Sequence, residues 1–240
     1  MSLELRGITK RFGALTANDA IDLAVADGEI HAILGENGAG KSTLMSILYG
    51  FYEADRGTIK VHGRNVHIRS PKEAIAVGIG MVHQHFMLVD PLSVIDNVML
   101  GAEGGVLLEK GERHIRAELE KLGRDYGLVI DPDAIVGALP VGLQQRVEIL
   151  KALIRGAEIL ILDEPTRGID LGAKAEIYEL LRTLANDGLS ILAVSSELVE
   201  IFEISQRVLV MHAGLITADL TREEATEQRV VAAATGEGNG

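Results

Sequence analysis

Hydrophobic and polar residues alternate along three early stretches of the chain, as they do in half-buried β-strands. These stretches are residues 3–9, 21–25 and 57–63, and the third is bounded by glycines. A mostly apolar run, 30–34, lies between them and leads into a glycine-rich turn. The first 63 residues therefore predict a β-rich front lobe around one buried strand.

Between residues 94 and 139 the apolar positions change to helical spacing. Ile115, Leu119 and Leu122 recur three or four residues apart, with charged residues between them. This spacing is typical of an amphipathic helix. We therefore expect a helical subdomain over about 86–156.

The second half of the chain alternates helix and strand patterns. The apolar run 158–163 ends in acidic residues and predicts a buried parallel strand. The alternating helix and strand patterns on either side of this run predict an α/β fold class. We expect one domain over 1–235, followed by a flexible tail at 236–240. The other elements expected here are helices at 143–154 and 174–184 and strands at 190–194 and 207–211.

Composition narrows the classes of function. Apolar residues make up 47% of the 240, which is ample for a buried core, and the formal charge of −12 argues against sequence-independent nucleic-acid binding. The chain has no cysteine and no basic-then-apolar leader, so we expect a cytoplasmic protein. No apolar run approaches the roughly 18 residues of a membrane span, so a membrane role would depend on a partner.

A phosphate-binding loop follows the strand at 30–34. It reads Gly-Glu-Asn-Gly-Ala-Gly-Lys-Ser and precedes a helical pattern at 42–49, which is the setting of a Walker A motif. Backbone N–H groups and the positive helix end can surround a polyphosphate, while Lys41 reaches the β- and γ-phosphates and Ser42 ligates Mg²⁺. The residues expected to hold the nucleotide are Gly35, Glu36, Asn37, Gly38, Ala39, Gly40, Lys41, Ser42 and Thr43.

Two acidic residues at the end of the strand at 158–163 complete a nucleotide site. Asp163 would hold Mg²⁺ through its water shell, and Glu164 would orient and deprotonate an attacking water. General-base help of this kind contributes about 10²- to 10⁴-fold to a rate. The alternative for these acids is a helix cap or solvated turn.

The order of four motifs resembles the ATPase subunits of ABC transporters over practically the whole chain. The motifs are the phosphate loop, Met81-Val-His-Gln84, Leu139-Pro-Val-Gly-Leu-Gln144 and Leu160-Ile-Leu-Asp-Glu-Pro-Thr166. The resemblance implies a P-loop NTPase core of the ABC ATPase type, with ATP and Mg²⁺ as ligands. It also implies that Gln84 contacts Mg²⁺ or the attacking water.

Two further roles rest on the resemblance and have structural alternatives. Phe12 would stack on adenine, or would otherwise be a core aromatic residue. Asp170 would be the aspartate that bridges two subunits, and it is equally well placed to cap the helix that contains Lys174.

The chain departs from the family pattern at two places. Where the family has Leu-Ser-Gly-Gly-Gln, this chain keeps Gly142 but has Pro140, Val141 and Leu143. In the family this motif, with Gly142 and Gln144 here, would close in trans on the γ-phosphate bound by another subunit. Ser196 stands where many relatives have a switch histidine, and we therefore predict slow hydrolysis with Glu164 as base.

Longer matches point to one branch of the family. Residues 81–89 and 141–153 resemble the first nucleotide-binding domain of nucleoside and simple-sugar importers, and the chain from Asp163 onwards resembles the second domain of ribose-type importers. We therefore expect an importer ATPase subunit at the cytoplasmic face of the membrane, peripheral and without nucleic acid. Its partners would be transmembrane permease subunits, contacted through Phe86–Pro91, indirectly a solute-binding protein, and a second nucleotide-binding domain in a homodimer or pseudo-dimer.

Alternatives remain open from sequence. One is a slow or non-hydrolysing regulatory subunit that depends on nucleotide, which Pro140 and Ser196 favour. Another is a non-transport ABC ATPase, against which the acidic charge argues. The transported solute, the choice between homodimer and heterodimer, and the choice between a natural single domain and a shortened or chimeric chain are not decided.

Overall fold

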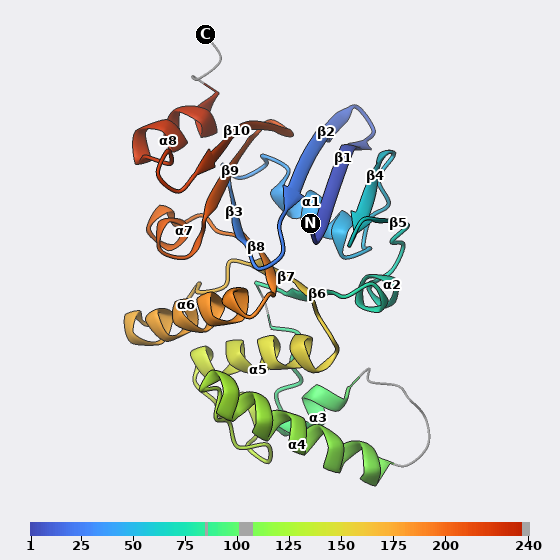
Figure 1. Ribbon diagram of the computed structural model, residues 1–240, viewed down its shortest axis with the longest axis vertical. Coiled ribbons are helices and arrows are strands. Elements are labelled where there is room, and N and C mark those ends of the chain that lie inside the picture. The colour runs from blue at the N-terminus through green and yellow to red at the C-terminus, as the bar shows by residue number, and fades with distance from the viewer. Residues whose placement is uncertain (85, 101–107, 237–240) are drawn as a thin grey trace.

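Two β-sheets form the frame of the protein in the computed structural model, which describes residues 1–84, 86–100 and 108–236. The smaller, antiparallel sheet has the order β2-β1-β4-β5 and the larger has the order β10-β9-β3-β8-β7-β6 (Figure 1). In the larger sheet all neighbours are parallel except β9 and β10. The strands are β1 (Leu3–Phe12), β2 (Leu15–Val25), β3 (Ile30–Leu34), β4 (Arg56–Val61), β5 (Arg64–Val66), β6 (Ile79–Val82), β7 (Ile159–Asp163), β8 (Ser190–Val194), β9 (Arg207–His212) and β10 (Leu215–Thr221).

The parallel strands are buried on both faces, because apolar layers cover each side of the larger sheet. On one face, Ile33 and Leu192 pack toward the smaller sheet and helix α1 (Lys41–Leu48), which lies between the two sheets. On the other face, Leu160 packs toward the helices of the second half of the chain. This double burial explains why these strands appear in the sequence as continuous apolar runs rather than alternating ones.

Helices gather below and beside the larger sheet in Figure 1. Ile115 and Leu119 of α4 share an apolar cluster with Val98 of α3 and Val147 of α5. These three helices form the helical subdomain, in which α5 packs on β6 and also on α6. The helices are α2 (Pro71–Ala76), α3 (Val94–Met99), α4 (Leu108–Tyr126), the 3₁₀ turn η1 (Val136–Ala138), α5 (Val141–Ile154), α6 (Leu171–Asn186), α7 (Leu198–Ile204) and α8 (Glu227–Thr235).

Capping side chains fix where several helices begin. Ser70, Ser93, Asp170 and Thr226 each accept a hydrogen bond from a backbone N–H in the first turn of α2, α3, α6 and α8, respectively. Such caps satisfy helix N–H groups that lack a partner within the helix. The start of α6 is therefore set by Asp170.

The predicted strands and helices are confirmed, and most are longer than predicted. The strands at 30–34 and 190–194 agree to the residue, whereas the predicted helix at 174–184 extends to Leu171–Asn186. Six elements were not predicted from sequence: β5, β6, β10, α2, α7 and α8. The part of the predicted tail at 237–240, and residues 101–107 of the predicted helical subdomain, lie outside the described residues.

Within the described residues, no helix combines the length and apolar character required to cross a membrane.

Candidate functional site

The glycine-rich loop leaves the end of β3 at the middle of the larger sheet. Gly40 has φ +101°, and a Cβ there would lie 2.2 Å from the Ala17 carbonyl oxygen. A Cβ at Gly35 would lie 2.2 Å from the Met211 carbonyl oxygen. At these two positions the loop follows a path that only glycine permits. The backbone is therefore shaped as the Walker A prediction requires.

The start of α1 offers donors to an anion. Lys41 Nζ donates to the carbonyl oxygens of Gly35 at 2.5 Å and Glu36 at 3.0 Å, so the ammonium lies over the loop. Among the described residues no side chain caps α1. The first N–H groups of a helix have no partner within it, and together with the helix dipole they attract phosphate.

Burial acts on Lys41 as well. Loss of solvent lowers the pKa of Lys41, and the nearby carboxylates of Glu164 and Asp163 oppose that change. The ammonium is therefore only partly solvated, and the negative charge of a phosphate ligand would compensate for the lost contacts with water. These features fit a nucleotide polyphosphate.

The two predicted acids stand at the carboxyl end of β7. Burial raises the pKa of the Asp163 carboxyl, and the negative charge of Glu164 adds to that rise, while His83 and Lys41 act against it. Two carboxylates this close are costly to keep charged without a cation. Their oxygen ligands are those that Mg²⁺ prefers, so the residues present fit the predicted metal.

Ser196 is next to the predicted base. The Ser196 hydroxyl donates to Glu164 Oε2 at 3.2 Å, and the Glu164 backbone N–H donates to the Val194 carbonyl oxygen at 2.8 Å. Glu164 itself has φ +52°, a left-handed conformation that is uncommon for a side chain of this kind. The ends of β7 and β8 therefore hold the carboxylate in one place.

Gln84 follows β6, the strand beside β7, and is half-buried. The ends of β3, β8, β7 and β6 lie at one edge of the larger sheet because these strands are parallel neighbours. That edge brings together Lys41, Asp163, Glu164 and Ser196. Ligands of open parallel sheets bind at such an edge.

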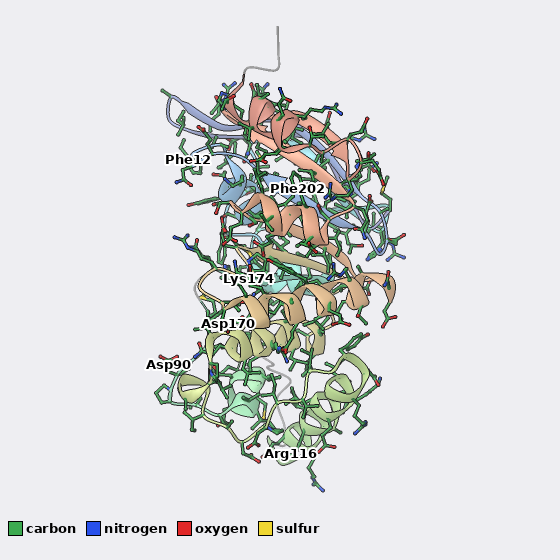
Figure 2. All side chains as sticks on the ribbon, turned by 90° about the vertical axis from the view of Figure 1, so that its left-hand side faces the viewer. Phe12, Asp90, Arg116, Asp170, Lys174 and Phe202 are labelled. Carbon is green, nitrogen blue, oxygen red and sulfur yellow. The ribbon has the colours of Figure 1, made fainter. Side chains whose placement is uncertain are left out.

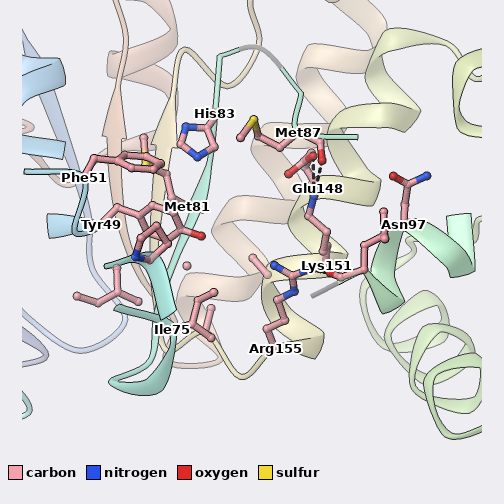
Figure 3. A pocket seen from close by; sticks show the side chains of 16 residues that line it. Tyr49, Phe51, Ile75, Met81, His83, Met87, Asn97, Glu148, Lys151 and Arg155 are labelled. Carbon is pink, nitrogen blue, oxygen red and sulfur yellow. Dashed lines mark hydrogen bonds and ion pairs between the residues drawn. The ribbon is translucent and has the colours of Figure 1, made fainter. Parts of the chain in front are cut away.

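A cavity of about 250 Å³ lies beside the Gln84 segment (Figure 3). It is bounded by the rings of half-buried Tyr49 and exposed Phe51 and by Lys151 of α5. Lys151 Nζ donates to Glu148 Oε1 at 2.9 Å and to the Met87 carbonyl oxygen at 3.2 Å. This buried pair ties the segment after β6 to the helical subdomain.

Phe12 is a surface residue, so the core alternative for it is wrong. Its side chain is 42% exposed, and its ring meets the edge of Tyr52 with centroids 5.2 Å apart. Lys10 Nζ lies 5.6 Å from the same ring centroid. An exposed pair of rings beside a cation can accept a stacked base.

The residues expected to act in trans contact other parts of the chain. Gly142 is buried in the first turn of α5, and a Cβ there would lie 3.0 Å from the Ala173 Cβ of α6. Gln144 Nε2 donates to the Leu139 carbonyl oxygen at 2.9 Å. Asp170 Oδ1 accepts from the backbone N–H groups of Gly172 and Ala173, so its capping role is confirmed.

Sequence reasoning missed several residues around the site. Glu200 accepts hydrogen bonds from Thr166 and Ser195. Lys151, which is paired with Glu148, donates to the Met87 carbonyl oxygen in the segment after β6. Glu200 could have been found, because it precedes Ile201 and lies one turn before Ile204 on the apolar face of a helix. An acid in that phase signals a buried polar contact.

Known proteins are similar to this chain. The sequence pattern of the ABC transporter family matches residues 18–167. The chain is 42% identical to the nucleoside import ATP-binding protein NupA of Lactococcus lactis, over 95% of this chain and 46% of NupA. It is 40% identical to a ribose import ATP-binding protein of Escherichia coli O157:H7, over 92% of this chain and 44% of that protein. The chain thus spans about half the length of the curated relatives it matches.

Solved structures share the fold. An ATP-binding cassette of an ABC transporter in its ADP conformation superimposes with a TM-score of 0.86 at 25% identity, over 98% of each chain. A bacterial ABC transporter cassette solved as a dimer gives a TM-score of 0.76 at 23% identity, over 92% of this chain and 98% of that chain. The fold expected from the sequence resemblance is therefore confirmed.

Proposed function

This chain belongs to the ABC transporter family, and we propose that it binds Mg-ATP and hydrolyses it to ADP and phosphate. The observation that carries the proposal is the shared edge of the larger sheet, where Lys41, Asp163 and Glu164 interact electrostatically. A phosphate-binding cation, a metal-binding carboxylate and a general base are the parts that this reaction requires. The same edge also carries Gln84.

The residues would divide the reaction among them. Backbone N–H groups of Gly38 to Thr43 and the Lys41 ammonium would bind the phosphates, and Phe12 with Tyr52 would stack on the base. Glu164 would take the proton of a water as its oxygen attacks the γ-phosphorus and the bond to the β–γ bridging oxygen breaks.

The metal would be held by a small set of side chains. Ser42, Gln84 and Asp163 are the residues that would hold Mg²⁺. When bound, the ion neutralises charge on the β- and γ-phosphates. The raised pKa of Asp163 fits this role, because a cation would favour its charged form.

We propose further that two such domains act together. In this chain the first turn of α5 contacts α6, and Gln144 contacts the turn before it. The phosphate loop would then be closed by Gly142 and Gln144 of a second nucleotide-binding domain, with Asp170 near the contact. A cassette of the same fold has been solved as a dimer.

The transport role is importing a simple sugar or a nucleoside. Relatives named as nucleoside and ribose import proteins support this role. The chain would act at the cytoplasmic face of the membrane, with permease subunits contacting Phe86–Pro91 and a solute-binding protein acting through them. Met87 in this segment is 62% exposed and lines the cavity of Figure 3, a surface that suits a partner.

A slow-turnover regulatory subunit is the second candidate, and one contact favours it. Ser196 replaces a histidine common in relatives, and its hydroxyl donates to Glu164 rather than extending a cation toward a phosphate. A serine cannot supply the reach or the positive charge of an imidazolium. This candidate keeps nucleotide binding and loses most hydrolysis.

Calorimetric titration of Mg-ATP tests the binding half of the proposal. We expect saturable binding by the parent chain and a loss of at least about tenfold in affinity in Lys41→Ala, because one charge-assisted phosphate contact is removed. Lys60→Ala is the matched control, since Lys60 pairs with Glu4 on the smaller sheet. Equal affinity in all three proteins would contradict the assignment of the loop.

The permease contact is tested by cross-linking. A cysteine introduced at Met87, in a chain without cysteine, should cross-link to a permease subunit in membranes that contain the assembled transporter. A cysteine at Val129, which is 79% exposed, is the control and should remain uncoupled. Cross-linking at Val129 alone would place the partner elsewhere.

A further inference from the structure

Three polar side chains are buried together behind the reacting residues. Glu200 is 1% exposed, and Thr166 and Ser195 are fully buried. They come from three segments: Thr166 follows β7, Ser195 follows β8 and Glu200 lies in α7. A buried carboxylate is costly unless both of its oxygens have partners.

Both carboxylate oxygens of Glu200 are used. Thr166 Oγ1 donates to Glu200 Oε1 at 2.8 Å, and Ser195 Oγ donates to Glu200 Oε2. Ser195 Oγ in turn accepts from the Glu197 backbone N–H at 3.0 Å. Burial raises the pKa of Glu200, and the two hydroxyl donors work in the opposite direction. One side chain thus joins the loop after β7 to the loop after β8.

The two loops carry the proposed base and the hydroxyl that contacts it. Thr166 is two residues after Glu164, and Ser195 directly precedes Ser196. Glu164 has φ +52°, a conformation that costs free energy and persists only where its surroundings fix it. The Glu200 bridge provides such a constraint from behind.

Neighbouring contacts hold the same loops to α6. Lys174 Nζ pairs with Glu197 at 2.8 Å, and the Tyr178 hydroxyl lies 3.5 Å from Thr166 Oγ1. Figure 2 shows Lys174 next to Asp170 at the start of α6. The polar surroundings of Glu200 therefore include a cation and a phenol from this helix as well as the two hydroxyls.

We propose that Glu200 is a positioning residue for ATP hydrolysis: it fixes the loops after β7 and β8 so that Glu164 meets its water. This inference rests on the proposed ATPase function. The two carboxylate oxygens of Glu200 accept from Thr166 and Ser195, so Glu200 acts through these two residues. Nucleotide binding, which depends on the phosphate loop after β3, should not need it.

A merely structural role makes a different prediction. If Glu200 served stability alone, its loss would lower the amount of folded protein and leave each folded molecule with a normal kcat. A positioning role lowers kcat in folded protein and leaves nucleotide affinity unchanged. Small misplacements of a reacting group cost up to about 10²-fold in rate.

The test uses four variants of the full chain. Thr166→Val removes one hydroxyl at nearly constant volume, Thr166→Ser keeps it, and Glu200→Ala removes the bridge. Glu203→Ala is the control on the same helix, since Glu203 forms an exposed pair with Arg182 at 3.7 Å. For each protein we would measure phosphate release, affinity for a non-hydrolysable ATP analogue, thermal unfolding, and amide hydrogen exchange at 164–167 and 195–197.

We expect kcat to fall about 10- to 100-fold in Thr166→Val and Glu200→Ala, with analogue affinity changed by less than about twofold. Thr166→Ser should recover most of the rate, and Glu203→Ala should match the parent. Exchange at both loops should accelerate in Thr166→Val and Glu200→Ala.

Two results would count against the proposal in distinguishable ways. Phosphate release by the parent with an unchanged kcat in Thr166→Val would overturn the positioning role and leave the ATPase function intact. Absence of phosphate release by the parent would overturn the ATPase function and this inference with it. If Glu200→Ala does not fold, the comparison of Thr166→Val with Thr166→Ser tests the positioning role alone.

Discussion

At the scale of single residues, burial disfavours the charged forms of the groups that would contact Mg-ATP. Burial lowers the pKa of Lys41 and raises the pKa of Asp163, and Glu164 next to Asp163 strengthens the second effect. Keeping these groups charged in the ligand-free site therefore costs free energy, and a ligand with opposite charges would reduce that cost. Such shifts cluster at functional sites.

The cost at Asp163 predicts that Asp163→Asn stabilises the ligand-free protein. Because the native pKa is raised, the native state binds more protons than the unfolded state between the two pKa values, and stability falls as pH rises through that interval. At neutral pH the variant avoids this loss, so its Tm should be higher than that of the parent. Thermal unfolding without nucleotide or Mg²⁺ measures it.

A second acid, Asp133, is the control for the predicted direction of the Tm change. Asp133 is exposed and accepts two hydrogen bonds from Arg116, which lower its pKa. Asp133→Asn should therefore leave Tm unchanged or lower it. The difference in Tm between Asp163→Asn and the parent should vanish at pH values below the ordinary pKa of aspartate. A Tm lower than that of the parent for Asp163→Asn at neutral pH would contradict the argument.

Ser196 gives a second prediction at this scale. We expect Ser196→His to raise ATP turnover by about tenfold or more, because an imidazole can extend past Glu164 and carry positive charge toward a phosphate. Ser196→Ala, which also removes the contact with Glu164 Oε2, should not produce this gain. Steady-state phosphate release decides, and equal rates for parent and Ser196→His would remove Ser196 from the explanation of slow turnover.

At the scale of secondary-structure elements, strongly patterned segments were predictable from sequence and weakly patterned ones were not. The strands β3, β7 and β8 are continuous apolar runs because both faces of the sheet are covered. In contrast, β10 has mixed burial and lies at the sheet edge, and α8 has three alanines in a row, so neither has a clear period. Packing against β9 decides both of these elements.

The site shows the same division. Lys41, Asp163 and Glu164 follow from motifs that fix a strand, a loop and a helix in order. The helical position of Glu200 indicates that this acid is buried, but it does not identify Thr166 as its partner. Lys151 likewise contacts the Met87 carbonyl oxygen, which lies far away in the chain, and a local pattern does not encode such a contact. The left-handed backbone of Glu164 is likewise a product of its neighbours.

The pair of Lys151 and Glu148 predicts a large effect on stability. Glu148 is 2% exposed, so Lys151→Met would leave a buried carboxylate without its cation. Loss of one partner of a buried pair costs about 3–5 kcal/mol. Urea unfolding measures the loss, which the double variant Glu148→Leu with Lys151→Met should largely recover. A double variant no more stable than Lys151→Met would argue against the pair as the cause.

At the scale of the whole molecule, the residues proposed to face nucleotide and partner share a side. Figure 2 shows Phe12, Asp170 and Asp90 along one edge of the molecule. Gly142 packs against Ala173, close to the start of α6 that Asp170 caps. A second domain that approached this edge would meet the phosphate loop and the first turn of α5 together.

This arrangement predicts dimers that depend on ATP. Glu164→Gln should retain ATP without hydrolysing it, so Mg-ATP should shift this variant from monomer to dimer in sedimentation velocity, whereas Mg-ADP should not. The control combines Glu164→Gln with Lys41→Ala, which removes a phosphate contact and should stay monomeric. Dimers that are indifferent to nucleotide would refute closure across this edge.

The central claim is that Glu164 acts as the base for ATP hydrolysis on this chain. Phosphate release at saturating Mg-ATP by the parent, compared with Glu164→Gln, tests it most directly. We predict measurable turnover by the parent and a fall of about 10²- to 10⁴-fold in the variant, the range for loss of general-base catalysis. Equal rates in the two proteins, or no release by the parent, would contradict the account.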